Sequence, residues 1–309
     1  MFKIPKLVQF IGVISVLLAS CQAPVKTNRT DALRETIVEY LAEKNALVGV
    51  SIIGNDGKDT LSINGERRFP MQSVFKFHIA LAVLSEVDKG NLSLDQEVLI
   101  KKEELLNQDF WSPLRDENPE GGSFTIKQLI QYTVSHSDNT ACDLLIGLIG
   151  TPKDVETYFK KNGIQDIEIT FNEKEMQANW DNMFKNWTTP IAASETLALF
   201  YENTDNLLSE SSHEFFWRTN VETSTGENRI KGKLPKGTIV AHKTGWSGTN
   251  EETGITAAVN NIGIVFLPNG EYFIISVFVT ESKESFEVNE MIIADIAKVT
   301  YDFYANSKN

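Results

Sequence analysis

The sequence is poor in cysteine and histidine, and this scarcity excludes several kinds of site. Of its two cysteines, Cys21 falls in an N-terminal leader, so only Cys142 remains in the folded part and no intramolecular disulfide can form. Cys142 lies in an apparent helix, where a buried structural role is expected. No nucleotide-binding loop is evident, and no cofactor is expected. The histidines lack ligand spacing, so no metal site is expected either; they are His78, His136, His213 and His242.

Positive charge is also in short supply. The 309 residues include 29 lysines and arginines against 42 aspartates and glutamates, which gives a net charge of −13. A uniformly acidic protein is poorly suited to nucleic acid or to anionic membrane surfaces, so no nucleic-acid partner is expected. Hydrophobic residues make up 41% of the chain, an ordinary globular composition. A chain of this length can bury a large core, as one large domain or as two lobes.

The longest apolar run lies in the leader. Two lysines precede residues 7–18, a run too short for a membrane span and typical of a signal peptide. It ends in Leu18-Ala19-Ser20-Cys21, which resembles a bacterial lipobox, in which the cysteine is lipidated and becomes the new N-terminus. Ordinary signal cleavage with an incidental Cys21 is the alternative, and we favour lipidation. Residues 1–21 are then the signal and residues 22–29 a tether, and the expected product is a periplasmic lipoprotein whose only membrane contact is its lipid.

Strand-like segments lie near both ends of the chain, and helical periodicity fills the middle. Residues 172–188 show little periodicity and are predicted to form a long loop. The expected helices cover residues 30–44, 73–89, 125–134, 140–149, 189–201 and 284–304. The expected strands cover residues 47–53, 60–63, 238–242, 255–259, 262–267 and 272–280.

This order predicts a single domain over residues 30–309. Its fold class is α/β, an α+β sandwich in which an antiparallel sheet is flanked by helices and carries an inserted all-helical lobe. The sheet lobe takes about residues 30–66 and 222–309, and the helical lobe takes about residues 67–221. A groove between two such lobes is a natural place for a site.

The first of three informative motifs is Ser73-Val74-Phe75-Lys76. Ser73 is expected at the start of a helix, where unpaired N–H groups favour a developing negative charge. Lys76 lies on the same helix face and can take the hydroxyl proton, provided that burial or neighbouring positive charge lowers its pKa. A capping serine followed by a solvent-facing lysine is the alternative, and the tetrad alone favours that alternative.

The second motif, Ser137-Asp138-Asn139, places a hydroxyl and an amide at a loop-to-helix junction. Ser137 can pass a proton to a leaving nitrogen, and Asn139 can form a hydrogen bond with a substrate amide. The alternative is an ordinary helix N-cap, since all three residue types cap helices well.

The third motif, Lys243-Thr244-Gly245, follows an apolar strand. Lys243 can attract a carboxylate and hold the serine of the second motif in place. Thr244 can donate a hydrogen bond to that carboxylate, and Gly245 permits a ligand to approach the strand backbone closely. The alternative is a turn after an edge strand.

In this order, the three motifs form the known signature of class A β-lactamases and penicillin-binding proteins. Together with Pro70-Met71-Gln72 and Ser135-His136, they make the chain resemble class A serine β-lactamases over nearly its whole length after the leader, and especially the PER- and VEB-type subgroup. The resemblance implies a monomer with the inserted-lobe fold, and hydrolysis of the β-lactam amide through an acyl-enzyme on Ser73. Backbone N–H groups of Ser73 and Trp246 would hold the oxyanion.

In this family a glutamate in an omega loop activates the deacylating water, in a pattern close to Glu-x-x-Leu-Asn. The matching segment here is Glu173-Lys174-Glu175-Met176-Gln177. Glu173 is therefore the expected base, ahead of Glu168 and Glu175, which do not begin the pattern. Whether this glutamate or the lysine of the first motif activates the serine stays open.

Several positions depart from the commonest family pattern. Gln177 replaces an asparagine that helps to hold the hydrolytic water. Asn186-Trp187 and Phe171 stand where many members pair an aspartate with an arginine, so the loop must be held differently. Trp246 replaces a small or hydroxyl residue; it keeps the backbone N–H, loses a hydroxyl contact to the substrate carboxylate, and carries a ring that can narrow the site.

Further substrate contacts are implied around the entrance. In PER-like members an arginine at the place of Arg229 reaches the substrate carboxylate, and a surface arginine is the alternative. Trp111 matches an aromatic residue that flanks the site, and a core position is its alternative. The segment Ser247–Thr253 lengthens the connection after the third motif, which favours bulky cephalosporins, and Ser247 is counted among the substrate contacts.

The sequence thus predicts a hydrolase of cephalosporins and penicillins that confers antibiotic resistance. A D-alanyl-D-alanine carboxypeptidase or penicillin-binding protein would share the three motifs but lack the deacylating glutamate. A sensor that stays acylated by the lactam would normally be fused to a membrane signalling region, and no transmembrane segment is evident after the leader.

Overall fold

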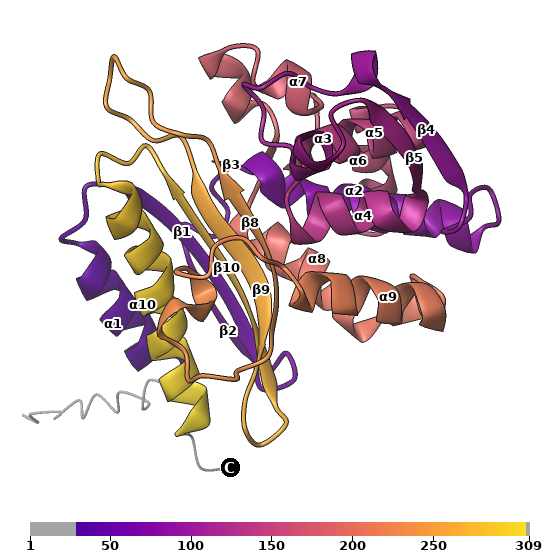
Figure 1. Ribbon diagram of the computed structural model, residues 1–309. Coiled ribbons are helices and arrows are strands. Elements are labelled where there is room, and N and C mark those ends of the chain that lie inside the picture. The colour runs from indigo at the N-terminus through magenta and orange to yellow at the C-terminus, as the bar shows by residue number, and fades with distance from the viewer. Residues whose placement is uncertain (1–28, 307–309) are drawn as a thin grey trace, which may run out of the picture.

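The computed structural model describes residues 29–306, and a five-stranded sheet forms its centre (Figure 1). The strand order is β2-β1-β10-β9-β8, and every neighbouring pair is antiparallel. The strands are β1 (Leu47–Gly54), β2 (Asp59–Ile63), β8 (Val240–Trp246), β9 (Val259–Phe266) and β10 (Tyr272–Thr280). The two ends of the chain therefore meet in the sheet, and β8 is left as an edge strand. The predictions for the leader, Cys21 included, concern residues outside the described range.

Both faces of the sheet are buried, because alternate residues of its strands enter two separate cores. In β10, Ile274 faces the core shared with the helical region, whereas Ile275 faces a second core. The second core is closed by α1 (Asp31–Leu41) and α10 (Phe286–Ala305), which cover the outer face together (Figure 1). The inner face packs against α8 (Pro190–Glu202). Burial on both faces explains why β10 is a nearly continuous apolar run.

The helical region is built around α2 (Phe75–Asp88), in which every residue from Phe75 to Ser85 is buried. A helix enclosed on all sides must be apolar all round, and α2 departs from this only at a few residues, including Lys76 and His78. The helices packed against it are α4 (Ile126–Ser135), α5 (Asn139–Ile149), α6 (Pro152–Lys161) and α9 (Glu210–Val221).

Short elements fill the connections. One small sheet has the order β3-β7-β6 and another pairs β4 with β5. These strands are β3 (Phe69–Pro70), β4 (Glu97–Lys101), β5 (Gly121–Thr125), β6 (Ile167–Glu168) and β7 (Trp187–Thr188). The short helices are η1 (Gln72–Val74), η2 (Lys102–Glu104), α3 (Pro113–Glu117), α7 (Glu173–Met176), η3 (Trp180–Phe184), η4 (Thr204–Asn206) and η5 (Ile230–Lys233). Within residues 29–306, no helix combines the length and apolarity needed to cross a membrane.

The predicted fold class is confirmed, but some local predictions are wrong. The expected strand 255–259 is wrong, because before Val259 only Thr256 forms isolated bridges, to Thr249 and Ser282. The expected strand 262–267 begins earlier, at Val259, because Asn260 and Asn261 are buried and bonded to neighbouring carbonyls instead of forming a turn. The expected strand 238–242 continues through the third motif, since those residues pair with β9. The expected loop 172–188 contains α7 and η3.

Candidate active site

Ser73 lies in η1, immediately before α2, and the residue before it, Gln72, has an unusual backbone conformation. Gln72 has a positive φ of 46°, a left-handed conformation that is costly for a residue other than glycine. The side chain of Gln72 donates to the carbonyl of Met183, at a distance of 2.9 Å. This contact ties the segment before Ser73 to the loop that carries η3.

Lys76 is fully buried, so the alternative of a solvent-facing lysine is wrong. Its Nζ lies 3.0 Å from Ser73 Oγ and 2.8 Å from Glu173 Oε1. It also donates to the Ser137 carbonyl at 2.8 Å and to Asn139 Oδ1 at 2.5 Å. The amino group of Lys76 therefore brings together residues from the first two motifs and from α7.

The second motif turns sharply before α5. Ser137 has a φ of 59°, and its Oγ accepts a hydrogen bond from Lys243 Nζ at 3.0 Å. Asp138 caps α5 through the N–H of Ala141 and also accepts the N–H of Leu114, both at 2.8 Å. Burial raises the pKa of the Asp138 carboxyl, and these hydrogen bonds oppose the rise. Asp138 thus fixes the bend that presents Ser137.

The third motif lies within the edge strand β8 instead of in a turn after it. Lys243 is buried, and its pKa is lowered well below the usual value by burial and then by the charge of Lys76. A Cβ atom on Gly245 would lie 2.5 Å from the Met71 carbonyl oxygen and 3.3 Å from the Ser73 nitrogen. The backbone that approaches Gly245 so closely is therefore the protein's own segment next to Ser73, a reason for glycine that the sequence did not reveal.

Glu173 begins α7 and faces the same cluster. Besides its contact with Lys76, its Oε1 lies 3.4 Å from Ser73 Oγ, and its Oε2 accepts a hydrogen bond from Gln177 Nε2 at 2.7 Å. The two competing glutamates have other partners: Glu175 accepts the N–H of Asn172, and Glu168 accepts the indole N–H of Trp187.

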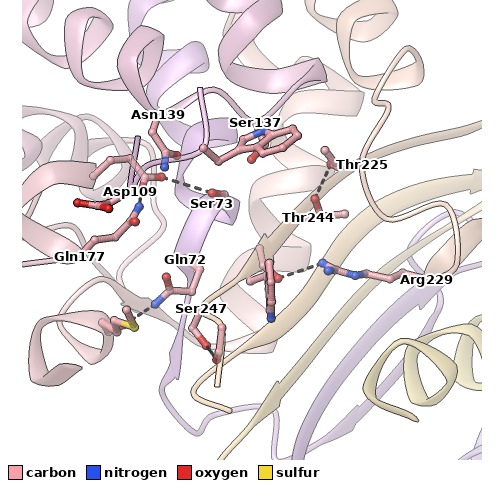
Figure 2. Close-up of a pocket in the computed structure, with 16 residues that line it drawn as sticks. Gln72, Ser73, Asp109, Ser137, Asn139, Gln177, Thr225, Arg229, Thr244 and Ser247 are labelled. Atoms are coloured by element: carbon pink, nitrogen blue, oxygen red, sulfur yellow. Dashed lines mark hydrogen bonds between the residues drawn. The ribbon is translucent and has the colours of Figure 1, made fainter. Parts of the chain in front are cut away.

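Ser73, Ser137 and Glu173 line one cavity of about 420 Å³, which is also lined by the predicted substrate contacts (Figure 2). Trp111 is 61% exposed and Trp246 is 55% exposed, so neither ring is a core residue. Trp111 Nε1 donates to the His136 carbonyl, and the hydroxyls of Thr225 and Thr244 lie 2.6 Å apart. The other lining residues are Gln72, Ser73, Asp109, Ser137, Asn139, Glu173, Gln177, Met183, Arg229, Gly245, Ser247 and Gly248.

A sequence model of the β-lactamase enzyme family matches residues 32–304. The chain belongs to this family. It is 50% identical to β-lactamase VEB-1 from Pseudomonas aeruginosa over 95% of this chain and 98% of that protein. It is 42% identical to the extended-spectrum β-lactamase PER-1 from the same organism, over 94% and 92% of the two chains. The crystal structure of TLA-1 extended-spectrum β-lactamase superposes with a TM-score of 0.86 at 45% identity, covering 90% of this chain and 99% of that one.

The resemblance to class A β-lactamases is therefore confirmed, and the arrangement suits their chemistry. A serine hydroxyl lies within reach of an amine and a carboxylate, as nucleophilic catalysis with proton transfer requires. No cluster of three or more potential metal ligands occurs in the part of the chain that the structure describes.

Two residues hold the loop over residues 169–186, here called the Ω-loop. Sequence reasoning missed Asp143, and it identified Asn186 only as a departure from the family pattern. Asp143 accepts the backbone N–H groups of Glu173 and Lys174, at 2.7 and 3.1 Å. Burial, followed by the charge of Glu173, raises the pKa of Asp143 to about 7. Asn186 accepts the N–H groups of Thr170 and Phe171, both at 2.9 Å, and donates to the Phe171 carbonyl at 2.8 Å. An amide therefore closes the loop where many relatives are expected to use a salt bridge.

Proposed function

We propose that the protein hydrolyses β-lactams through an acyl-enzyme on Ser73. The observation that carries this proposal is the position of Ser73 Oγ, 3.0 Å from Lys76 Nζ and 3.4 Å from Glu173 Oε1. In the acylation step, Oγ bonds to the lactam carbonyl carbon and gives its proton to one of these two groups. The ring C–N bond then breaks, and the nitrogen takes a proton from the Ser137 hydroxyl, which Lys243 holds in place. The proton released by Ser73 then restores the Ser137 hydroxyl, so the net result is transfer of one proton from Ser73 to the lactam nitrogen.

The tetrahedral intermediate carries an oxyanion, which we assign to the backbone N–H groups of Ser73 and Trp246. Preorganised donors of this kind contribute about 3–4 kcal/mol each. The close packing of Gly245 against the Ser73 segment supports the assignment, because it brings the two N–H groups into one neighbourhood.

For deacylation we assign Glu173 as the base. It removes a proton from water, the hydroxide attacks the ester carbon, and Ser73 leaves with a proton. The hydrogen bond from Gln177 to Glu173 Oε2 supports a role for Gln177 in orienting the carboxylate and hence the water.

We infer that the substrates are cephalosporins and penicillins, so that the protein confers resistance to them. Lys243 and Thr244 are the proposed partners of the substrate carboxylate, and Asn139 is the proposed partner of its side-chain amide. Arg229 is proposed to act from the wall of the same cavity. The remaining proposed contacts are Trp111, Gln177, Gly245, Trp246 and Ser247. Their shared cavity supports this set, as does the similarity to PER-1, an extended-spectrum enzyme.

We further propose that the protein acts as a monomer in the periplasm, held to a membrane by a lipid on Cys21. The lipobox-like tetrapeptide supports this proposal. Cell fractionation after metabolic labelling with a fatty acid tests it: the label and the membrane association should both be lost in Cys21→Ser. A Cys21→Ser protein that stays with the membrane would contradict the anchor.

Purified mature protein mixed with a chromogenic cephalosporin tests the activity, when hydrolysis and covalent mass are followed together. Continuous turnover is expected, with none in Ser73→Ala. A stoichiometric burst that leaves a persistent adduct would instead favour a penicillin-binding protein or a sensor.

A further inference from the structure

The peptide unit between Gly245 and Trp246, in the edge strand β8, directs its carbonyl and its N–H to opposite edges of the strand. Backbone groups of successive residues in a strand point to opposite edges, so Thr244 and Trp246 point the same way and Gly245 points the other way. The Thr244 carbonyl accepts a hydrogen bond from Lys243 Nζ, the group that also binds Ser137 Oγ. The Trp246 N–H therefore faces the reactive cluster, and the Gly245 carbonyl faces away from it.

That carbonyl is held by Arg229. Arg229 Nη1 donates to the Gly245 oxygen at 3.0 Å, the bond drawn as the dashed line from Arg229 in Figure 2. It also donates to the Asn260 oxygen at 3.0 Å. Arg229 is only 4% exposed, so the alternative of a surface arginine is wrong. Its Nε binds Glu290 Oε1 at 3.1 Å, which fixes the guanidinium against α10.

The side chain of Trp246 is tied to the same guanidinium through Phe286. The Trp246 and Phe286 rings lie 5.0 Å apart, and Arg229 Cζ lies 5.6 Å from the Phe286 ring centroid. Arg229 thus constrains this residue from two directions, at the backbone and through the packed ring.

We propose that Arg229 is a positioning residue for the oxyanion site, acting through the Gly245–Trp246 peptide. This inference rests on the proposed acyl-enzyme function. A charge-assisted hydrogen bond to the carbonyl is stronger than a neutral one and polarises the peptide, so the N–H at the other end becomes a better donor and keeps its direction. Loss of an oxyanion donor costs about 10²–10³ in rate, and loss of its support alone should cost about tenfold.

The test must separate this role from direct binding of the substrate carboxylate. Two chromogenic cephalosporins serve as probes, identical except that one has a free C4 carboxylate and the other its methyl ester. The variant Arg229→Met/Glu290→Met removes both charges, because a buried carboxylate left without its partner would destabilise the fold. We expect the acylation rate at saturation, followed by covalent mass, to fall about tenfold with both probes.

A loss confined to the free acid would make Arg229 a carboxylate ligand and overturn the inference, and an unchanged rate with both probes would overturn it too. If the double variant does not fold, Arg229→Lys gives the same comparison, with a smaller loss that is again equal for both probes. Lys231→Met is the matched control, since this nearby cation donates to the Thr223 carbonyl and does not line the cavity, and the variant should acylate like the parent. A parent protein that is never acylated would instead refute the proposed function.

Discussion

Replacing Gly245 with alanine should separate the two oxyanion donors. The new methyl group would lie 2.5 Å from the Met71 carbonyl oxygen, about 1 Å short of the 3.4 Å at which ordinary contact begins. The neighbour is backbone in a buried segment, so β8 must move away from η1 by roughly that amount. Because Gly245 is absent from the residues with positive φ, the clash and not backbone strain is the expected cause.

A displacement of this size in a preorganised site should lower the reaction rate strongly. A misplacement of about 1 Å can cost about 10²-fold, and complete loss of one oxyanion donor costs about 10²–10³-fold. We therefore expect the acylation rate of Gly245→Ala to fall about 10²-fold or more. Stopped-flow mixing with a chromogenic cephalosporin measures this rate, and a thermal melt establishes that the variant is folded.

Gly147→Ala provides the control. Gly147 lies in α5 with open space around the position of an added Cβ atom, so alanine should leave the acylation rate unchanged and stabilise the helix by about 1 kcal/mol. A folded Gly245→Ala protein that acylates at the parent rate would refute the assignment of the oxyanion site.

Three further predictions concern the buried ionisable groups. Glu173→Gln should accumulate the acyl-enzyme in intact-mass spectra, and normal deacylation would show that another group is the base. Burial raises the folded pKa of Asp143 to about 7, so between about pH 4 and pH 7 the folded state binds a proton that the unfolded state has lost. The stability of the protein therefore falls as pH rises through that window. Asp143→Asn should remove this pH dependence of the melting temperature. Burial lowers the pKa of His78 to about 4, against the opposing effect of the Val74 backbone, so stability is lost as pH falls from about 6.5 to 4. His78→Leu should keep its melting temperature at about pH 5, and a loss equal to the parent's would contradict this account.

Short-range patterns predicted much of the framework. Hydrophobic periodicity predicted both ends of α2 and of α10 to within two residues, because long buried helices contain many apolar residues at helical spacing. The helix α6 also left a local signal that was not used, since Thr151 and Asp154 form a capping box around Pro152. Its net polarity hid the apolar stripe.

Long-range pairings could not be predicted. Asp143 reaches the Ω-loop backbone some thirty residues away, and nothing in its neighbours distinguishes it from a solvated aspartate. Asn260 and Asn261 suggest a turn by composition, yet their amides satisfy carbonyls of Met71 and Lys243 inside the fold. Arg229 likewise becomes a buried residue only because Glu290, in the last helix, neutralises it.

The way in which Asn186 closes the Ω-loop has a consequence for the conditions the protein tolerates. A salt bridge in that place would weaken as ions screened it and would break when its carboxylate took up a proton. The three hydrogen bonds of Asn186 carry no net charge and have no group that titrates. The closure of the loop by Asn186 should therefore be insensitive to salt and to acid. The hydrogen bonds from Glu173 and Lys174 to Asp143, by contrast, depend on a carboxylate that titrates.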